Sequence, residues 1–110
     1  MISSVTGPQM AMRQQPIYAT AKAALVGLVR SLSLDEAKFG ITTNAVLPGW
    51  IATDTQSEFE NMQGSHSPLG RSGKPEEIAS LVTWLASSSS SYLTGQCLVV
   101  DGGNSIAEEQ

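Results

Sequence analysis

Tyr18 and Lys22 lie four residues apart in the stretch PIYATAKAAL, whose remaining side chains are apolar apart from one threonine. Residues with this spacing project from the same face of a helix, so the phenol and the ammonium can contact one ligand. A tyrosine hydroxyl ordinarily ionises near pH 10, but a positive charge about 4 Å away, at an effective dielectric of about 20, stabilises a phenolate by about 4 kcal/mol. The pair is therefore a candidate proton-transfer site. Taken alone, the spacing also fits a surface tyrosine packed on a lysine stem.

The tyrosine and lysine do not stand alone, because other stretches accompany them in a fixed order. Together these stretches resemble the C-terminal half of the short-chain dehydrogenase/reductase superfamily, and most closely its beta-ketoacyl-carrier-protein-reductase-like members. The resemblance runs from Ile2 to about Ile106 and is specific for the family rather than for a substrate. The accompanying stretches are ISSVTG (2–7), NAVLPGWIATD (44–54), PLGRSGKPEEIASLVTWLAS (68–87) and YLTGQCLVVDGGN (92–104).

The resemblance implies roles for three side chains. In that family, a serine matching Ser4 holds the substrate oxygen, the tyrosine matching Tyr18 passes the proton, and the lysine matching Lys22 eases ionisation of the tyrosine and grips the nicotinamide ribose. These roles suit hydride transfer, because the negative charge that develops on a carbonyl oxygen needs a donor placed in advance and a proton source. Ser3 is the other serine of this stretch. The register of SSVTG favours Ser4, and both serines also fit as ordinary residues of a turn at a strand end.

A turn at Pro48 and Gly49 follows a predicted strand. Open α/β sheets bind ligands outside the carboxyl ends of their strands, which is where this turn is expected to lie. The resemblance implies that this segment contacts the nicotinamide amide, through the backbone of Ile51 and the side chain of Thr53. Thr53 also fits a helix cap. The cofactor-binding residues expected from the resemblance are therefore Tyr18, Lys22, Pro48, Gly49, Ile51 and Thr53.

The resemblance implies NAD or NADP as the cofactor and indicates no preference between them. The family's glycine-rich loop, which cradles the pyrophosphate at a helix N-terminus, has no counterpart here, since none of the ten glycines forms G-x-G-x-x-G. The pyrophosphate-binding loop is thus absent from these residues. We therefore expect the 110-residue chain to bind neither NADH nor NADPH with submicromolar affinity.

The secondary structure expected around these motifs begins with a long helix. Apolar residues recur at steps of three and four, which predicts a helix over 18–39 with Gly40 as its left-handed end. The segments ITTNAVLPG (41–49) and QCLVVDGGN (96–104) are short, apolar and closed by turn residues, which is typical of buried strands. The apolar stripe of the long helix comprises Ala21, Leu25, Leu28 and Leu32.

Two further helices are expected between these strands. Over 53–64, Thr55 and Glu58 have the spacing of a capping box, which predicts a short helix. Over 74–88, Pro75 and two glutamates mark a helix start, and apolar residues follow at helical spacing.

Alternating helices and strands predict an α/β fold in which right-handed crossovers join parallel strands covered on both faces. With the resemblance, this becomes the C-terminal half of a Rossmann-like doubly wound parallel sheet whose N-terminal dinucleotide-binding half is missing. We assign residues 1–106 to this partial domain and 107–110 to a polar tail. MISS reads as the tail of a strand whose first residues are missing, and because the preceding strands are then absent we also expect the strand TTNAVL (42–47) to form a bare sheet edge.

Composition excludes several functions. Six Lys and Arg against ten Asp and Glu give a net charge of -4 and no basic cluster, which argues against a nucleic-acid partner. Cys97 is the only cysteine, so neither an intrachain disulfide nor a thiolate metal site is expected. This cysteine content predicts a cytoplasmic location. No apolar stretch approaches the roughly 20 residues of a membrane span, so no membrane partner is expected. A serine hydrolase built on Ser4 and His66 lacks the G-x-S-x-G elbow.

Two classes of function remain. The first is an NAD(P)-dependent oxidoreductase that transfers hydride to or from a small carbonyl or alcohol substrate, with this chain as its truncated catalytic half. The second is a catalytically silent fragment or binding module that docks on a full-length subunit of the same family. In the family, helices matching those that begin near Tyr18 and Pro75 form subunit interfaces, so a homo-oligomer or a docked complex is expected.

Overall fold

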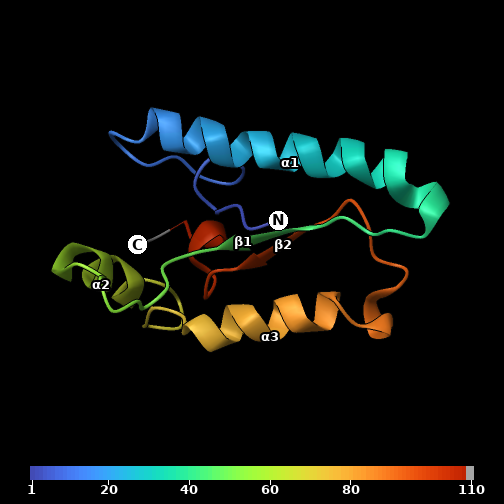
Figure 1. Cartoon of the computed structure of the whole chain (residues 1–110). Coiled ribbons are helices and arrows are strands. Elements are labelled where there is room, and N and C mark those ends of the chain that lie inside the picture. The colour runs from blue at the N-terminus through green and yellow to red at the C-terminus, as the bar shows by residue number, and fades with distance from the viewer. Residues whose placement is uncertain (109–110) are drawn as a thin grey trace.

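The computed structural model describes residues 1–108 and has three layers (Figure 1). A parallel pair of strands, β1 (Ala45–Pro48) and β2 (Cys97–Val100), lies between helix α1 (Pro16–Glu36) on one side and helix α3 (Pro75–Leu85) on the other. The short helix α2 (Glu58–Ser65) lies at one end of the strands. The predicted α/β fold with parallel strands is therefore confirmed. Residues 109–110 of the predicted polar tail lie outside the described part of the chain.

Strand β1 is paired along both of its edges. On one edge Val46 pairs with Leu98 of β2, and on the other it forms a parallel bridge with Ile2. The Val46 amide donates to the Met1 carbonyl at 2.9 Å, and the Ser3 amide donates to the Val46 carbonyl at 2.8 Å. The expectation of a bare edge at 42–47 is wrong for this strand, because residues 1–5 cover that edge. Leu47 is consequently fully buried in the core.

The two crossovers between parallel strands lie on opposite faces of the sheet. The chain passes from residues 1–3 through α1 to β1, and from β1 through α3 to β2, so both steps move across the sheet in the same direction. Figure 1 shows α1 and α3 on opposite sides of the strands. Crossovers with that arrangement must have opposite hands, so the right-handed rule fails for one of them. The connection from β1 to β2 also contains α2 and long loops, so it is not the compact unit from which the rule follows.

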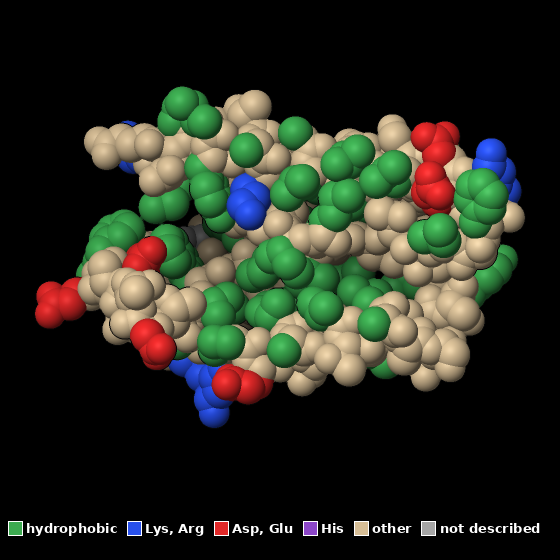
Figure 2. Space-filling view, in the orientation of Figure 1, with side chains coloured by type: hydrophobic (Ala, Val, Ile, Leu, Met, Phe, Trp, Pro, Cys, Tyr) green, Lys and Arg blue, Asp and Glu red, His purple; other side chains and the backbone are tan. Residues whose placement is uncertain are grey.

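The buried face of α1 differs from the predicted stripe. Val26, Val29 and Ser33 are its buried residues, whereas Leu28 of the predicted stripe is 46% exposed and Ala21 is exposed as well. Hydrophobic residues occur all around this helix, so periodicity alone does not say which side meets the sheet. Figure 2 shows hydrophobic side chains gathered along the visible side of α1 and in the band between α1 and α3. Helix α1 ends at Glu36, and a 3-10 turn (Ala37–Phe39) continues it to Gly40, which has the predicted left-handed conformation with φ +72°.

Helix α1 with its final turn, residues 16–39, is long and apolar enough to cross a membrane by length and composition, with a mean hydropathy of 1.3. The sequence expectation that no such segment exists is corrected here, because it considered only uninterrupted apolar runs. A core helix of an α/β protein passes the same test. In this structure Val26 and Val29 pack toward the sheet, so α1 serves as one layer of the fold.

Helix α2 runs from Glu58 to Ser65 rather than over 53–64, and its N-cap lies two residues later than predicted. Its N-cap is Ser57, whose Oγ accepts from the Glu60 amide at 3.2 Å while the Ser57 amide donates to Glu60 Oε2 at 2.7 Å. The predicted capping box at Thr55 and Glu58 is therefore wrong. Both pairs satisfy the same four-residue pattern, and tertiary contacts distinguish them. Gln56 Nε2 donates to Ser72 Oγ at 3.0 Å, which ties the residue just before the cap to a distant loop.

An ion pair fixes the start of α3, which begins at Pro75 as predicted. Both Arg71 guanidinium nitrogens, Nη1 and Nη2, donate to the Glu77 carboxylate at 2.8 Å, and the Lys74 amide donates to its Oε2 at 2.7 Å. The hydrogen bonds from Arg71 and then from Lys74 lower the pKa of Glu77 from 4.5 to about 2. This contact joins the loop after α2 to the first turn of α3.

The stability of the chain is expected to fall as the pH drops from about 4.5 to 2. Because the folded pKa of Glu77 lies below its ordinary value, the stabilisation from this contact is complete above pH 4.5 and is lost as pH falls through about 2. Chemical unfolding at several pH values measures this decline. Glu77→Gln should reduce it, whereas Glu76→Gln, at a neighbouring position that makes no ion pair among residues 1–108, should preserve it. An identical decline in both variants would contradict the assignment.

Gly7 holds the loop that follows residues 1–5 against α1. Its φ is +106°, and a Cβ at this position would overlap the Ala19 carbonyl oxygen. The loop is closed by the Gly7 amide, which donates to the Met10 carbonyl at 2.8 Å. Only glycine fits this approach of loop to helix.

Gly7→Ala is expected to destabilise the chain by more than about 1 kcal/mol, through positive φ and steric overlap. Gly27→Ala is the matched control, since a Cβ at Gly27 of α1 meets nothing within 4 Å. That control should stabilise the chain by about 0.5–1 kcal/mol because alanine is the better helix former. Urea unfolding followed by circular dichroism measures both changes, and equal effects of the two variants would refute the explanation.

Candidate active site

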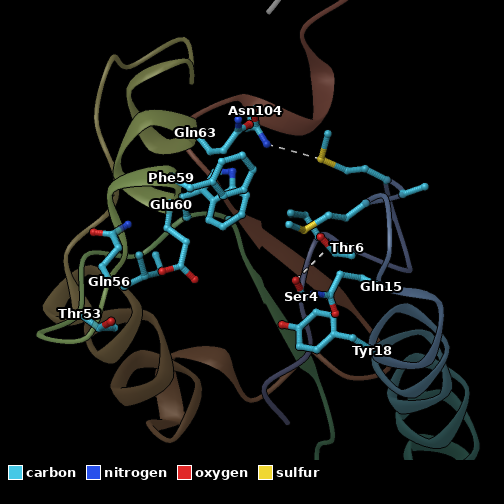
Figure 3. Close-up of a pocket in the computed structure, with 17 residues that line it drawn as sticks. Ser4, Thr6, Gln15, Tyr18, Thr53, Gln56, Phe59, Glu60, Gln63 and Asn104 are labelled. Carbon is cyan, nitrogen blue, oxygen red and sulfur yellow. Dashed lines mark hydrogen bonds between the residues drawn. The ribbon is translucent and has the colours of Figure 1, made fainter.

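A cleft of about 490 Å³ lies between the loop that follows residues 1–5 (called the first strand below because it pairs with β1), the turn after β1, and helix α2. Figure 3 shows side chains from these segments and from α1 converging on one space. Because the strands are parallel, their carboxyl ends meet at the same edge of the sheet, and this is the edge at which the cleft lies. Of the predicted site residues, Ser4, Tyr18, Gly49, Ile51 and Thr53 line it.

The two candidate serines have different surroundings. Ser4 lines the cleft, and its Oγ accepts a hydrogen bond from the Thr6 amide at 3.1 Å. Ser3 instead donates through its Oγ to the Lys22 carbonyl at 2.7 Å, which anchors α1 on the first strand. Figure 3 shows the hydroxyls of Ser4 and Tyr18 directed into the same space. The structure thus brings Ser4 and Tyr18 together and gives Ser3 a structural contact.

Lys22 lies one helical turn beyond Tyr18 and does not itself line the cleft. Its Nζ is 5.6 Å from the centre of the Tyr18 ring and donates to the Ile2 carbonyl at 3.3 Å. The ammonium therefore lies beside the aromatic ring on the same helix face, as the spacing predicts. It also links α1 to the outer edge of the first strand.

The turn after β1 presents backbone groups to the cleft. The Gly73 amide donates to the Trp50 carbonyl, and the Ala52 amide donates to the Gly73 carbonyl, each at 2.8 Å. Successive backbone groups of an extended chain point in opposite directions, so the amide and carbonyl of Ile51 point away from Gly73. No hydrogen bond among residues 1–108 uses either group. Ile51 therefore offers one donor and one acceptor beside the cleft.

The turn itself depends on a close approach between β1 and the end of β2. The Gly49 amide donates to the Val100 carbonyl at 3.0 Å, and a Cβ on Gly49 would lie 2.7 Å from Asp101 Cβ. Pro48 does not line the cleft, but its carbonyl accepts from the Val5 amide at 3.1 Å. The Pro48–Gly49 turn thus joins the two loops that border the site.

Asp101 fixes the remaining border of the cleft. Its Oδ1 accepts from the Gly103 amide at 2.9 Å and its Oδ2 from the Ser105 amide at 2.7 Å. Burial opposes ionisation of this carboxyl, but these hydrogen bonds outweigh it and lower the pKa of Asp101. The result is a rigid turn that carries Asn104 into the lining of the cleft.

None of the residues of the α2 wall was among the predicted catalytic or cofactor-binding residues, although the resemblance implies that this segment lies over the substrate. Phe59 and Glu60 face the cleft, and the Phe59 ring meets the Trp50 ring edge to face at 6.4 Å between centroids. The signal was present in the sequence, because the lining residues of this segment recur at i, i+3, i+4 and i+7. They are Gln56, Phe59, Glu60 and Gln63, and Met10, Met12 and Gln15 form part of the opposite wall.

Comparisons with known proteins agree with this geometry. A family described as Enoyl-(Acyl carrier protein) reductase matches residues 1–105. Oxidoreductase UcpA of Salmonella typhimurium is 40% identical over 98% of this chain and 46% of its own length. A 3-oxoacyl-[acyl-carrier-protein] reductase, FabG of Rickettsia felis, is 43% identical over 81% of this chain and 39% of its own length.

Solved structures show the same likeness. Acetoin dehydrogenase YohF of Salmonella typhimurium matches with a TM-score of 0.85 and 42% identity, over 97% of this chain and 42% of the other. BdcA, solved in complex with NADPH, matches with a TM-score of 0.85 and 39% identity, over 93% of this chain and 43% of the other. The chain spans somewhat less than half the length of the relatives it matches. On sequence and structure, it belongs to the short-chain dehydrogenase/reductase superfamily, among relatives of the 3-oxoacyl-carrier-protein reductase type.

Proposed function

We propose that this chain carries the catalytic residues of an NAD(P)-dependent oxidoreductase that interconverts a small carbonyl compound and its alcohol. The observation that carries the proposal is the convergence of the Ser4 and Tyr18 hydroxyls on one cleft, with the Lys22 ammonium 5.6 Å from the tyrosine ring. Membership of the family supports the same reaction class. The single free cysteine, Cys97, favours the cytoplasm as its location.

Ser4 and Tyr18 act on the substrate oxygen. Ser4 Oγ accepts from the Thr6 amide, which leaves the Ser4 hydroxyl proton available to a carbonyl oxygen in the cleft. Tyr18 Oη then donates its proton to that oxygen as the carbonyl carbon gains hydride and the C=O π electrons move to oxygen. A neutral alcohol leaves, and the phenolate that remains on Tyr18 is stabilised by the Lys22 ammonium.

The residues present fit the nicotinamide end of the cofactor. NAD(P)H, when bound, supplies the two electrons and the proton of the hydride. Ile51 offers an amide and a carbonyl that no described residue uses, which suits a carboxamide. Gly49 and Thr53 also line the cleft. The Lys22 ammonium lies beside the Tyr18 ring, outside the lining, and would be the cation that holds a ribose hydroxyl. Nothing in these contacts favours NADH over NADPH.

In a longer protein that carries this segment together with a pyrophosphate-binding loop, replacing Tyr18 by Phe is expected to abolish hydride transfer while leaving cofactor binding intact, because only the proton donor is removed. Lys22→Ala should impair both. Tyr92→Phe is the matched control, since the Tyr92 side chain is fully exposed and lies outside the cleft. Nicotinamide absorbance with a panel of carbonyl compounds measures transfer, and nicotinamide fluorescence measures binding. Near-normal rates in the Tyr18 variant would overturn the assignment.

A second candidate is a non-catalytic module that docks on a related subunit or on another copy of itself. One observation favours it: Ile17 and Leu34 of α1 are 85% and 80% exposed, and hydrophobic side chains gather on the visible face of the molecule (Figure 2). Analytical ultracentrifugation of the chain alone and mixed with a full-length FabG-type reductase distinguishes the candidates. The docking-module candidate requires a dimer of the chain alone or a complex with the reductase, and a monomeric chain in both samples would exclude it.

A further inference from the structure

The lining of the cleft carries a single formal charge. Among the described residues that line it, Glu60 is the only acid and no lysine or arginine is present. The other lining residues of the two facing walls are apolar or neutral, including Met10, Met12 and Phe59. No basic residue in this lining offsets the charge, and because the Glu60 side chain is partly exposed, its effect on a bound molecule is modest.

The Glu60 carboxylate is held in place by its own helix. Oε2 accepts from the Ser57 amide at 2.7 Å, and Ser57 Oγ accepts from the Glu60 amide at 3.2 Å. Figure 3 shows the side chain extending from α2 into the space across from Ser4 and Tyr18. No hydrogen bond among residues 1–108 uses Oε1. The carboxylate thus has one oxygen committed to the cap and one available to a ligand.

This carboxylate is ionised at neutral pH. The hydrogen bonds from Ser57 to the carboxylate lower the pKa of Glu60 below its usual range. Its place in the first turn of α2 favours the negative charge further, because the helix dipole is positive at that end. A carboxylate or phosphate on a bound substrate would therefore meet a fixed like charge, whereas a hydroxyl or ammonium would meet an acceptor.

We propose that Glu60 is a specificity-determining residue that selects substrates bearing a hydroxyl or ammonium group near the reacting carbon and disfavours those bearing a carboxylate or phosphate there. The inference rests on the proposed function, because it names the substrate class of the same cleft. The donor group hydrogen-bonds to Glu60 Oε1 while the reacting oxygen lies with Ser4 and Tyr18. The selection is electrostatic and does not depend on proton transfer by Tyr18.

Three alcohols of one carbon frame test the charge preference: 1-amino-2-propanol, 1,2-propanediol and lactate. Their dissociation constants for the 110-residue chain are measured at pH 7 and low salt by amide NMR titration, which detects weak binding. We expect the amino alcohol to bind about threefold more tightly than the diol and lactate about threefold more weakly, since partly exposed charges contribute modestly. Raising the salt to about 0.5 M should shrink these differences by screening.

Two variants of α2 separate Glu60 from the general charge of the protein. Glu60→Gln keeps an acceptor for the Ser57 amide, so the capping box is preserved, and the three affinities should converge to within about twofold. Glu58→Gln makes the same change in net charge on the same helix, outside the cleft lining, and should leave the preference intact. The Ser57 and Glu60 amide shifts report whether the helix remains folded in each variant.

The inference is overturned if the wild-type chain binds all three probes equally or binds none, or if Glu58→Gln has the same effect as Glu60→Gln. Tyr18→Phe separates this result from the proposed function, since the charge preference should survive loss of the phenol hydroxyl. A preference in this chain, with no hydride transfer by a longer protein that carries this segment and a pyrophosphate-binding loop, would contradict only the proposed function. Hydride transfer without a preference would contradict only the role of Glu60.

Discussion

The pairing of β1 on both edges is the constraint on which the site depends. Through Val46 and Pro48 this strand holds residues 1–5 on one side, and through its pairing with β2 it holds the turn at Asp101 on the other. All three segments end at the same edge of the sheet because the strands are parallel. Each contributes a lining residue to the cleft, and because Ala45 and Leu47 are fully buried the strand has little freedom to shift.

Helix α1 reaches the cleft through two contacts with the first strand. Ser3 Oγ donates to the Lys22 carbonyl, and Lys22 Nζ donates to the Ile2 carbonyl. Residues 2–3 thus fix both the position of α1 along its axis and its rotation about that axis. Gly7 then allows the following loop to approach Ala19 closely. These contacts place the Ser4 and Tyr18 side chains in the lining of the same cleft, although the two residues are fourteen positions apart in the sequence. The two adjacent serines thus have different roles: Ser3 positions α1, and Ser4 faces the cleft.

Fewer contacts with the sheet constrain the α2 wall than constrain the other walls of the cleft. Its cap, one edge contact between Trp50 and Phe59, and the Gln56 to Ser72 hydrogen bond fix it, and no strand runs through it. A wall of this kind can differ in sequence without disturbing the sheet. The same segment supplies Glu60, so the charge of the cleft is set by a part of the chain that the core does not constrain.

Local sequence by itself determined the element types, the left-handed Gly40 that closes the turn after α1, the start of α3 at Pro75, and the Tyr18 and Lys22 pair. Each follows from spacing or from one residue's backbone preference. Tertiary structure decided which face of α1 is buried, since apolar residues surround that helix and only packing selects Val26 and Val29. It also decided between two equivalent capping boxes for α2, and it placed the two crossovers on opposite faces. The position of the Glu60 carboxylate in the cleft depends on which capping box forms. Residue spacing predicts which side chains share a face of α2, but only long-range contacts such as that between Gln56 and Ser72 decide that this face lines the cleft.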